Sequence, residues 1–534
     1  MNRHISILIL AILFLAVGCK NETPKSIVPV TRDTSITKEN AFTNLFLDSA
    51  DVEKYLLADT ITGDDSLLVD NFYKERNYQF AWFDTTGITE QALNFKNLYH
   101  KYIFDFGDSS LINARLDEEI EDFVINTPDL TKPGNKIKKL ELDLTKHFFK
   151  YARLAYEGST KMKLSDLGWF IPRKKLDLKL LLDSVVASKG SVLNNYEPNH
   201  PILGKLTQAF VNYTNINKNG GWDTSLTAPK ANYKIGDSLP AIGALKKRLI
   251  IEGDLDKNAQ NDFFDSATVL AVNQSRQRFG LKASGVVDAA FVKELNVPVH
   301  SRLQQLMINM ERLKWVPKPD SGRYVIVNIP DYKLFVYDNN QLQFDMVVVT
   351  GSEAHSTVIF SDEISVIAFS PYWNIPYSIV KKEIGNRGQA YYDRNHYEVV
   401  GKYSDGLPQL RQKPGPWNAL GRVKFLFPNS YSIYLHDTPS KHVFNRDNRA
   451  ASHGCIRIQE PAKMAAFLLD YDPAYTQDSI TKLMNATKEV NVKLKRKVPV
   501  FICYFTSWVD KNGLVNFRKD IYKHDEQMLD KLFK

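Results

Sequence analysis

The stretch YLHDTPSKHVFNRDNRAASHGCIRI, residues 434–458, sets one cysteine among loop-forming residues with two histidines upstream of it. His453 lies two positions before Cys455, and His436 lies near the start of the stretch. A thiolate nucleophile needs a base, backbone N–H donors for the developing oxyanion and an exposed position. Gly454 has no Cβ, so we expect the backbone there to approach a substrate closely. The stretch therefore predicts a cysteine nucleophile with two candidate bases.

The other cysteines point to an exported protein that is not a disulfide scaffold. The chain has three cysteines, and an apolar run at residues 5–17 followed by small residues leads into Cys19. This run is too short to span a bilayer and resembles a bacterial lipoprotein signal at residues 1–19, in which Cys19 is lipidated. An ordinary secretory signal or an uncleaved anchor are the alternatives. The polar residues 20–43 then predict a flexible tether.

Length and net charge limit the number of domains and the kinds of partner that the chain can have. A chain of 534 residues is too long for one core and predicts about three domains. The net charge of +8 is mild for this length and accompanies no nucleic-acid motif, so we expect no nucleic-acid partner. Cys503 lies in an apolar run typical of a strand, which predicts a buried, inert thiol. Cys455 is the better nucleophile.

The first half of the chain reads as helical. Residues 44–234 predict a helical scaffold domain, in which an aromatic cluster around Tyr78 favours core packing over a ligand platform. Residues 235–297 predict three short helices. Gln274, Arg276 and Gln277 in the second, followed by Phe279-Gly280-Leu281, resemble the glutamine-rich helix of a small peptidoglycan-binding domain, although Asn273 stands where that family usually has an aromatic residue. A generic three-helix spacer is the alternative. Residues 298–320 predict a linking helix with one apolar face.

Residues 321–534 have the residue pattern expected of a β-rich domain. We expect strands on both sides of an Asp338-Asn339-Asn340 hairpin turn, and a short strand that ends at His436. Residues 378–412 interrupt this pattern with a polar segment that reads as helical or loop-like, and we interpret it as a lid. The strand around Cys503 is followed by a polar tail. The fold class predicted for the whole chain is α+β and multidomain.

The motif His436…Ser452-His453-Gly454-Cys455-Ile456-Arg457 resembles the signature of L,D-transpeptidases of the YkuD type. Two further stretches, WNIP at residues 373–376 and PGPWNALG at residues 414–421, resemble the YcbB branch of that family. The order of parts, from helical scaffold through peptidoglycan-binding unit and linking helix to catalytic domain with a lid, resembles it as well.

The resemblance implies transfer between peptidoglycan stem peptides. Cys455 would attack the third residue of a tetrapeptide stem, release D-alanine and pass the acyl group to a second stem as a 3→3 cross-link. It assigns proton transfer to His436, support of the oxyanion loop to Ser452, His453 and Gly454, and substrate binding to Arg457, Trp373 and Asn374. Many members carry Asn at the position of Arg457. The resemblance implies no metal and no cofactor, and peptidoglycan and a membrane as partners in the cell envelope.

Other functions remain open at this point. Water as the acceptor would make the protein an L,D-carboxypeptidase, and a protein amine would make it an attachment enzyme. A non-catalytic wall-binding scaffold is an alternative of a different class, and so is a zinc site built from Cys455, His436 and His453. His442 is a competing candidate base outside the motif.

Overall fold

The structure is a computed structural model that describes residues 43–58, 64–126, 130, 132–159, 163–173, 175–191, 201–317 and 322–532. The signal at residues 1–19, lipidated Cys19 and nearly all of the tether therefore lie outside the described residues. Within the described ranges, no helix is both long enough and apolar enough to cross a membrane.

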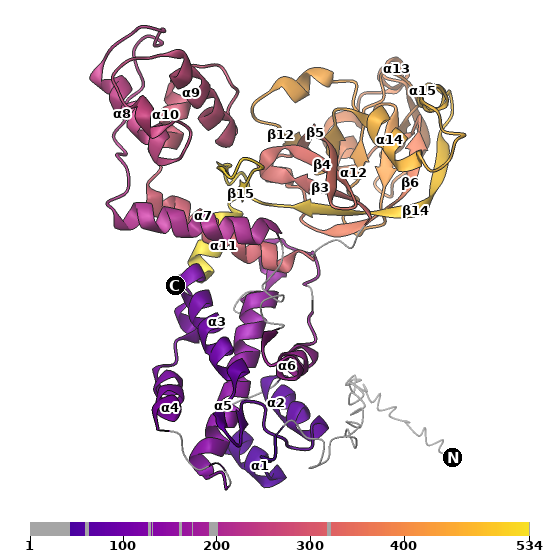
Figure 1. Cartoon of the computed structure of the whole chain (residues 1–534). Coiled ribbons are helices and arrows are strands. Elements are labelled where there is room, and N and C mark those ends of the chain that lie inside the picture. Colours follow the sequence, from indigo (N-terminus) through magenta and orange to yellow (C-terminus); the bar gives the residue numbers. More distant parts are fainter. Residues whose placement is uncertain are drawn as a thin grey trace, which may run out of the picture.

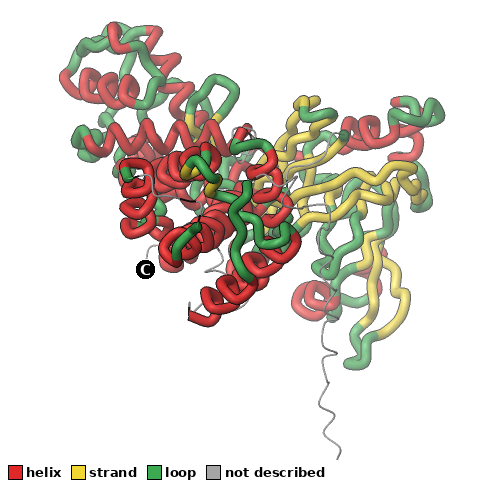
Figure 2. Tube along the Cα trace, turned by 60° about the horizontal axis from the view of Figure 1, so that its bottom comes forward, coloured by secondary structure: helices red, strands yellow, loops and turns green. Residues whose placement is uncertain are grey.

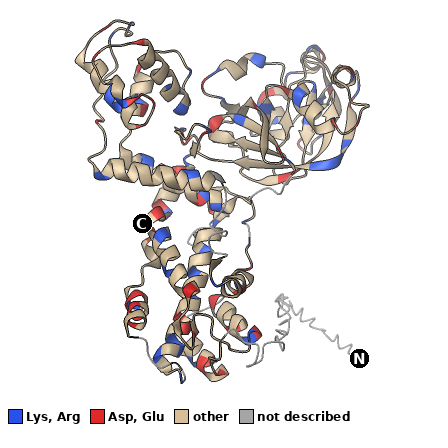
Figure 3. Ribbon diagram, in the orientation of Figure 1, with Lys and Arg blue, Asp and Glu red and all other residues tan. Residues whose placement is uncertain are grey.

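The molecule has a helical lower body that carries two upper lobes, one helical and one β-rich (Figure 1). Figure 2 shows the strands gathered on one side of the molecule and most helices on the other. Acidic and basic residues are interspersed along the chain in both the lower body and the upper lobes (Figure 3). The lower body contains a small hairpin, β1 (Phe83–Asp84) and β2 (Gly87–Ile88), and these helices: α1 (Ser49–Ala58), α2 (Asp64–Glu75), α3 (Glu90–Phe106), α4 (Ala114–Ile125), α5 (Asn135–Ala152) and α6 (Leu178–Ala187).

The aromatic cluster predicted around Tyr78 is the core of this lower body, which confirms core packing. Trp82 stacks on Phe95 with ring centroids 5.6 Å apart, and both side chains are fully buried. The carboxylate of Glu141 on α5 is buried in this core and accepts hydrogen bonds from the backbone N–H groups of Ala81 and Trp82. Tyr78 itself is only half-buried at the edge of the cluster.

The helical upper lobe contains α8 (Pro240–Ile251), α9 (Ser266–Arg278) and α10 (Ala289–Leu295), close to the three helices predicted from the sequence. The Asp265 side chain accepts a hydrogen bond from Thr268 N and caps α9, and Asp288 caps α10 in the same way. A side-chain oxygen at the N-cap satisfies a backbone donor that has no partner within the helix.

The end of the chain is not a polar tail, so that prediction is wrong. Residues after Cys503 form the hairpin β15 (Ser507–Val509) and β16 (Val515–Phe517), followed by α16 (His524–Leu532). Val515 and Phe517 are buried in the core of the three-helix lobe, and Phe517 stacks on Phe279 of α9. The C-terminal hairpin thus belongs to a core formed mainly by residues 203–313.

The linking helix α11 (Val299–Trp315) lies beside α7 (Pro201–Lys218) between the lower body and the upper lobes (Figure 1). The sequence predicted one apolar face, but polar side chains on α11 are also buried. Arg312 forms an ion pair of 2.5 Å with Asp525 of α16, and the Asn309 amide donates to Thr506 Oγ1. Paired partners make burial of these polar groups tolerable.

The β-rich lobe is one large sheet with the strand order β12-β5-β13-β11-β10-β6-β14-β3-β4. Because β4 also pairs with β5, all of the sheet except β12 closes into a ring. Its strands are β3 (Arg323–Asn328), β4 (Lys333–Asp338), β5 (Gln341–Gly351), β6 (Ser361–Phe369), β10 (Val423–Leu426), β11 (Leu435–His436), β12 (Ala450–Ser452), β13 (Ile456–Ile458) and β14 (Val490–Cys503). Helices α14 (Pro461–Leu469) and α15 (Gln477–Met484) follow β13.

The segment at residues 378–412 differs from the prediction of a helical or loop-like excursion. It starts with short helical turns, α12 (Tyr377–Ile379) and α13 (Gln389–Arg394), and then contributes two strands, β8 (Tyr397–Lys402) and β9 (Pro408–Gln412). Together with β7 (Trp373–Asn374) these strands form a separate three-stranded sheet. The segment has its own small apolar core around Val380, Tyr392 and Leu410.

A loop of the lower body reaches into the β-rich lobe. Trp169 pairs with Ile359 as an isolated β-bridge and is buried in the core of the β-rich lobe. The neighbouring Phe170 ring lies 5.2 Å from the ring of Tyr431. The scaffold therefore contacts the loop that precedes β11.

Candidate active site

Three of the predicted site residues, His436, Cys455 and Arg457, come together on a parallel pair of short strands. His436 in β11 is the register partner of Arg457 in β13, and Leu435 is the partner of Ile456. Tyr434 and Cys455 occupy the next position outward in the same register, and Tyr434 O accepts a hydrogen bond from Ile456 N. Since side chains alternate between the two faces of a strand, Tyr434, His436, Cys455 and Arg457 share one face of this pair.

Cys455 is half-buried, and its thiol donates a 3.5 Å hydrogen bond to the carbonyl of Ser432. Burial raises the pKa of the Cys455 thiol, whereas hydrogen bonds from the backbone and hydroxyl of Tyr434 and the charge on Arg457 act to lower the pKa. The thiol is therefore protonated at rest, and the groups that favour the thiolate are Tyr434 and Arg457.

His436 is buried, and its Nδ1 lies 2.5 Å from the carbonyl oxygen of Asp437. A carbonyl only accepts hydrogen bonds, so Nδ1 carries the proton and Nε2 is left as the basic nitrogen. Burial, together with the charge on Arg457, lowers the pKa of His436 to about 4, although the carbonyls of Asp437 and Leu420 and the charge on Asp437 act to raise it. The imidazole is thus neutral near pH 7, as a general base must be.

The peptide that orients His436 is fixed by the side chain of Asp437. Its carboxylate accepts hydrogen bonds from the backbone N–H of Arg422 at 2.8 Å and from Lys441 Nζ at 2.5 Å. Gly421 adopts a φ of +64°, and a Cβ there would lie 2.4 Å from this carboxylate. A glycine is required at position 421 both for its backbone conformation and for this close approach.

The loop at residues 452–455 is held by its own polar groups. Ser452 Oγ donates a 2.6 Å hydrogen bond to the carbonyl of Cys455 and accepts one from Gly454 N. Gly454 has a φ of +108°, and a Cβ there would meet no atom closer than 3.9 Å. The glycine is therefore needed for its backbone conformation, and close approach of this backbone to a substrate stays a prediction. Because Ser452 engages Gly454 N, the N–H of Cys455 and the hydroxyl of Tyr434 are the better oxyanion donors.

A second set of hydrogen bonds supports this loop from outside. Thr357 Oγ1 donates a 2.8 Å hydrogen bond to Gly454 O and accepts one from Gly351 N. Tyr522, near the C-terminus, donates to Gly351 O and accepts from Thr357 N. The C-terminal segment therefore stabilises the position of the residue directly before the cysteine.

Arg457 has no carboxylate partner among the described residues, and its Nε is buried without a hydrogen bond. Burial lowers the pKa of Arg457, and the neighbouring Cys455 raises it. An arginine pKa lies far above neutrality, so the guanidinium stays charged. A planar, charged guanidinium that is not paired with a protein carboxylate is suited to bind a carboxylate of the substrate.

Trp373 and Asn374 lie in β7 and pair with β9 of the small sheet. Trp373 packs against the apolar core of the segment at residues 378–412, and Asn374 is exposed. In the same region the ring of Trp417 stacks on His396 with centroids 3.7 Å apart. None of the hydrogen bonds or ring contacts of the described residues joins Trp373 or Asn374 to Cys455 or His436.

The remaining histidines lie apart from the thiol. His453 is exposed, with its ring 5.1 Å from that of His355, and His442 lies on the 3-10 helix Lys441–Asn445. Among the described residues, no group of three or more His, Cys, Asp or Glu side chains is arranged to hold a metal ion. The three residues of the zinc alternative therefore do not form such a group.

Comparison with known families identifies the β-rich lobe. Residues 322–481 match the L,D-transpeptidase catalytic domain, YkuD. This lobe is a YkuD domain. Ahead of the YkuD domain, residues 68–210 match a family described as "Scaffold domain", and residues 238–295 match one described as "Putative peptidoglycan binding domain". The α+β fold class and the order of helical region, peptidoglycan-binding domain and YkuD domain are thereby confirmed.

Relatives of the YkuD domain include a curated Haemophilus influenzae protein named "Putative L,D-transpeptidase". It is 30% identical over 243 residues, which cover 42% of this chain and 49% of that protein. The chain thus spans about half the length of the curated relative that it matches.

Similar solved structures include an L,D-transpeptidase from Stackebrandtia nassauensis (13% identity, 52% of this chain, 97% of that chain, TM-score 0.23). An L,D-transpeptidase from Mycobacterium smegmatis has 12% identity over 34% of this chain and 59% of that chain, with a TM-score of 0.19. The catalytic domain of an E. faecium L,D-transpeptidase acylated by ertapenem has 10% identity over 35% of this chain and all of that chain (100%), with a TM-score of 0.17.

Tyr434, Asp437, Thr357 and Tyr522 were not predicted as site residues. The signal for Tyr434 was present, because a residue two positions before His436 in a strand lies on the same face. Asp437 directly follows His436, so its position was also a signal. Thr357 and Tyr522 support the site through contacts between segments that are distant in sequence, and no local pattern marks them.

Proposed function

We propose that this protein is a lipid-anchored L,D-transpeptidase of the YcbB-like branch that forms 3→3 cross-links in cell-envelope peptidoglycan. The single observation that carries the proposal is the shared face of Tyr434, His436, Cys455 and Arg457 within the YkuD domain. A peptidoglycan-binding domain in the same chain supports peptidoglycan as the substrate. The lipid anchor rests on the sequence around Cys19.

The first half-reaction forms a thioester. His436 Nε2 takes the proton of the Cys455 thiol, and the thiolate attacks the carbonyl carbon of the third residue of a donor stem. A C–S bond forms, and the electron pair of the carbonyl moves onto its oxygen. Collapse of this intermediate breaks the C–N bond to the terminal D-alanine, whose nitrogen leaves with the proton from His436.

The second half-reaction transfers the acyl group. The side-chain amine of a second stem attacks the thioester carbon, and His436 accepts a proton from that nitrogen. The C–S bond breaks, and the proton returns to the sulfur as the thiol of Cys455 is restored. The new C–N bond is the 3→3 cross-link. The two half-reactions as written need neither a cofactor nor a metal.

The polar groups around the thiol have separate roles in this proposal. The Cys455 N–H and the Tyr434 hydroxyl donate to the oxyanion, where charge develops in the transition state. Arg457 binds a stem carboxylate through its fork. Ser452 and Gly454 shape the loop, with His453 at its exposed side. Trp373 and Asn374, in the strand that pairs with the lid at residues 378–412, bind substrate.

The direct test is acylation of the purified protein by a carbapenem, measured by mass spectrometry of the intact chain. The wild type is expected to gain the mass of one carbapenem, and Cys455→Ala is expected to gain none. Cys503→Ala is the matched control, because that thiol is buried and burial raises its pKa. A wild type without an adduct, or an adduct that survives in Cys455→Ala, would rule out the proposed nucleophile.

The acceptor is tested on the cell wall. Muropeptides from strains with the wild-type gene, with Cys455→Ala and without the gene are separated and quantified. The proposal expects 3→3 dimers only with the wild type. Tripeptide stems without such dimers would assign water as the acceptor and a carboxypeptidase activity, and protein-linked stems would assign an attachment enzyme. Identical wall composition in all three strains would favour the non-catalytic scaffold.

A further inference from the structure

The motif PGPWNALG at residues 414–421 contains no group that reacts in the proposed chemistry. It lies between β9 of the small three-stranded sheet and β10 of the large sheet. Within the motif, Asn418 is completely buried. A buried side-chain amide costs free energy unless it is hydrogen-bonded, so the partners of Asn418 show which parts of the domain this motif holds together.

The amide nitrogen of Asn418 contacts both ends of the small sheet. It donates to the carbonyls of Pro371 and Lys413, each at 3.0 Å, and lies 3.3 Å from the carbonyl of Gln412. Pro371 precedes β7, where the chain enters the small sheet, and Gln412 is the last residue of β9, where the chain leaves it. One side chain thus joins the two ends of the segment that contains the lid at residues 378–412.

A second buried amide, that of Gln412, attaches the same motif to the lid itself. Gln412 Nε2 donates a 3.1 Å hydrogen bond to the carbonyl of Asn395 in the lid, and Gln412 Oε1 accepts one of 2.9 Å from Ala419 N. The ring of Trp417 stacks on His396 of the lid. The position of the motif therefore depends on the position of the lid.

The oxygens of Asn418 hold the turn that leads to His436. Asn418 Oδ1 accepts a 2.8 Å hydrogen bond from Leu420 N, and Asn418 O accepts one of 2.8 Å from Gly421 N. Burial lowers the pKa of His436 to about 4, whereas the carbonyl of Leu420 acts to raise it, so this carbonyl lies within reach of the imidazole. Gly421 packs against the carboxylate of Asp437, whose carbonyl accepts from His436 Nδ1. The turn held by Asn418 thus contacts both His436 and the residue that orients it.

We propose that Asn418 is a positioning residue that couples the lid to His436. Its amide nitrogen contacts the ends of the lid segment and its oxygens contact the turn, so a displacement of those ends moves Leu420 and the carbonyl beside the imidazole. Asn418 acts through Leu420 and does not itself react. The role of His436 as the base rests on the proposed function, whereas the coupling of the lid to the imidazole rests only on these contacts.

The test breaks the contacts on the lid side and keeps those on the turn side. In Asn418→Asp the carboxylate cannot donate to the carbonyls of Pro371 and Lys413, but it can still accept from Leu420 N. Hydrogen exchange of residues 373–412, measured by mass spectrometry, is expected to be about tenfold faster than in the wild type. The ring ¹⁵N signals of His436 at pH 7, assigned with His436→Ala, are expected to shift. Carbapenem acylation is expected to be about tenfold slower.

A second variant, Gln412→Ala, tests the same coupling without a new charge. It removes the hydrogen bonds to Asn395 and Ala419. Lid exchange, the His436 signals and acylation are expected to change in the same direction as in Asn418→Asp, with the two rates altered about threefold or more. Thermal melts verify that each variant is folded, and Gln412→Ala decides the test if Asn418→Asp does not fold.

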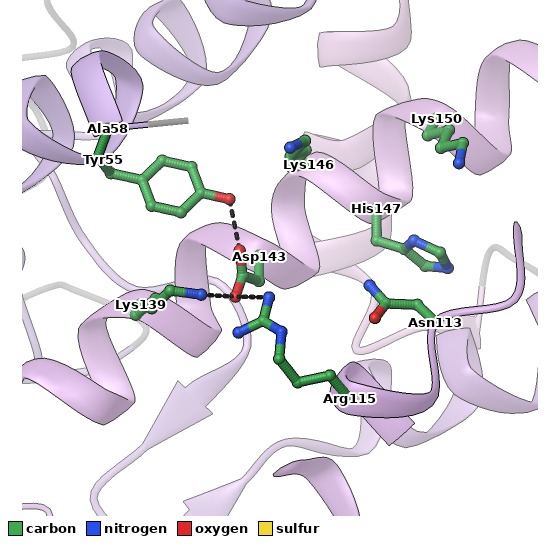
Figure 4. Close-up of a pocket in the computed structure, with 9 residues that line it drawn as sticks. All are labelled: Tyr55, Ala58, Asn113, Arg115, Lys139, Asp143, Lys146, His147 and Lys150. Carbon is green, nitrogen blue, oxygen red and sulfur yellow. Dashed lines mark hydrogen bonds and ion pairs between the residues drawn. The ribbon is translucent and has the colours of Figure 1, made fainter. Parts of the chain in front are cut away.

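Two controls separate the coupling from a loss of stability and from the Asn-to-Asp change itself. Val500→Ala removes buried volume from β14 in the core of the same domain and leaves the hydrogen bonds of Asn418 intact. Asn113→Asp lies in the scaffold, at a polar pocket between α1, α4 and α5 (Figure 4). The Asn113 side chain caps α4 by accepting a hydrogen bond, which Asp does equally well. Both controls are expected to match the wild type in all three measurements.

Lid exchange equal to that of the wild type in both variants would overturn the proposal. Faster lid exchange with unchanged His436 signals would overturn it as well, and so would signals that shift equally in Val500→Ala. Exchange and ring signals do not require catalysis. A wild type that is not acylated would therefore overturn the transpeptidase proposal, while these two measurements would still decide the coupling.

Discussion

Thr357 Oγ1 donates a 2.8 Å hydrogen bond to the carbonyl of Gly454, the residue directly before the proposed nucleophile, Cys455. The same hydroxyl accepts a hydrogen bond from Gly351 N, so it joins β5 to the cysteine loop. Cys455 is therefore positioned by contacts on both sides of its loop, from Ser452 within it and from Thr357 outside it.

Replacement of Thr357 by valine is expected to slow acylation of Cys455. Two buried hydrogen bonds are lost at similar side-chain volume, a cost of roughly 1–3 kcal/mol for each group left unpaired. We expect acylation by a carbapenem about tenfold slower, measured by stopped-flow or time-resolved mass spectrometry. Thr357→Ser keeps the hydroxyl and is expected to stay near the wild-type rate; equal slowing in both variants would exclude the hydrogen bond as the cause.

Removal of the Tyr434 hydroxyl tests its role beside the thiol. Tyr434→Phe removes a donor to Cys455, so the pKa of the thiol is expected to rise and acylation to slow about tenfold to a hundredfold. Tyr431→Phe is the matched control, because Tyr431 is exposed in the preceding loop. An acylation rate in Tyr434→Phe equal to that in the control would show that the hydroxyl does not act in the reaction.

The pH dependence of acylation reports the state of His436. Since burial lowers the pKa of this imidazole to about 4, it stays neutral, and able to accept a proton, down to about pH 5. Carbapenem acylation is therefore expected to show no acid limb near the ordinary histidine pKa of about 6.5. His436→Ala is expected to fold and to lose most of its acylation. A rate that halves near pH 6.5, or a near-normal rate in His436→Ala, would contradict this assignment.

The pH dependence of the free energy of unfolding tests the protonation state of His436 in the native chain. An unfolded chain binds a proton at His436 near pH 6.5, whereas the native chain does so only near pH 4, so this histidine destabilises the native state as the pH falls between those values. His436→Asn is expected to gain about 2–3 kcal/mol relative to the wild type between pH 7 and pH 4.5. Urea unfolding at both pH values measures it, with exposed His442→Asn as the control. A difference that is constant with pH would refute the buried neutral imidazole.

Substitution of Arg457 tests its proposed contact with a stem carboxylate. Arg457→Gln is expected to raise KM for a tetrapeptide stem about tenfold or more, with a smaller change in kcat, because a charge-assisted contact to the substrate is lost. With a stem whose terminal carboxylate is converted to an amide, wild type and variant are expected to converge if that carboxylate is the one bound. An equal effect of the substitution on both stems would place the role of Arg457 elsewhere.

Local patterns predicted much of the fold and the central site residues. The turn at Asn339-Asn340 joins β4 and β5 as expected, and both residues adopt positive φ, as a two-residue hairpin turn favours. The strand composition before His436 and the loop-forming residues around Cys455 predicted a strand end and a loop, and the structure places them there. Asp265 and Asp288 cap two of the three short helices predicted within residues 235–297.

The missed features depend on tertiary contacts. Val399 and Val400 favour a strand, but β8 is stable only through pairing with β9, which lies across a turn in a polar segment. Buried polar groups on α11, such as Arg312, are stabilised by a partner more than 200 positions away in the chain. No periodicity in the sequence reports a partner at that distance.

The C-terminal hairpin has a mechanical consequence. The chain runs from the three-helix lobe through α11 into the YkuD domain, and β15–β16 then returns to bury Val515 and Phe517 in that same lobe. The chain thus passes between the two lobes twice instead of once. The second passage restricts rotation of one lobe relative to the other. Glycan held by one lobe would reach the thiol of the other at a nearly constant spacing, and removal of the hairpin β15–β16 would release that constraint.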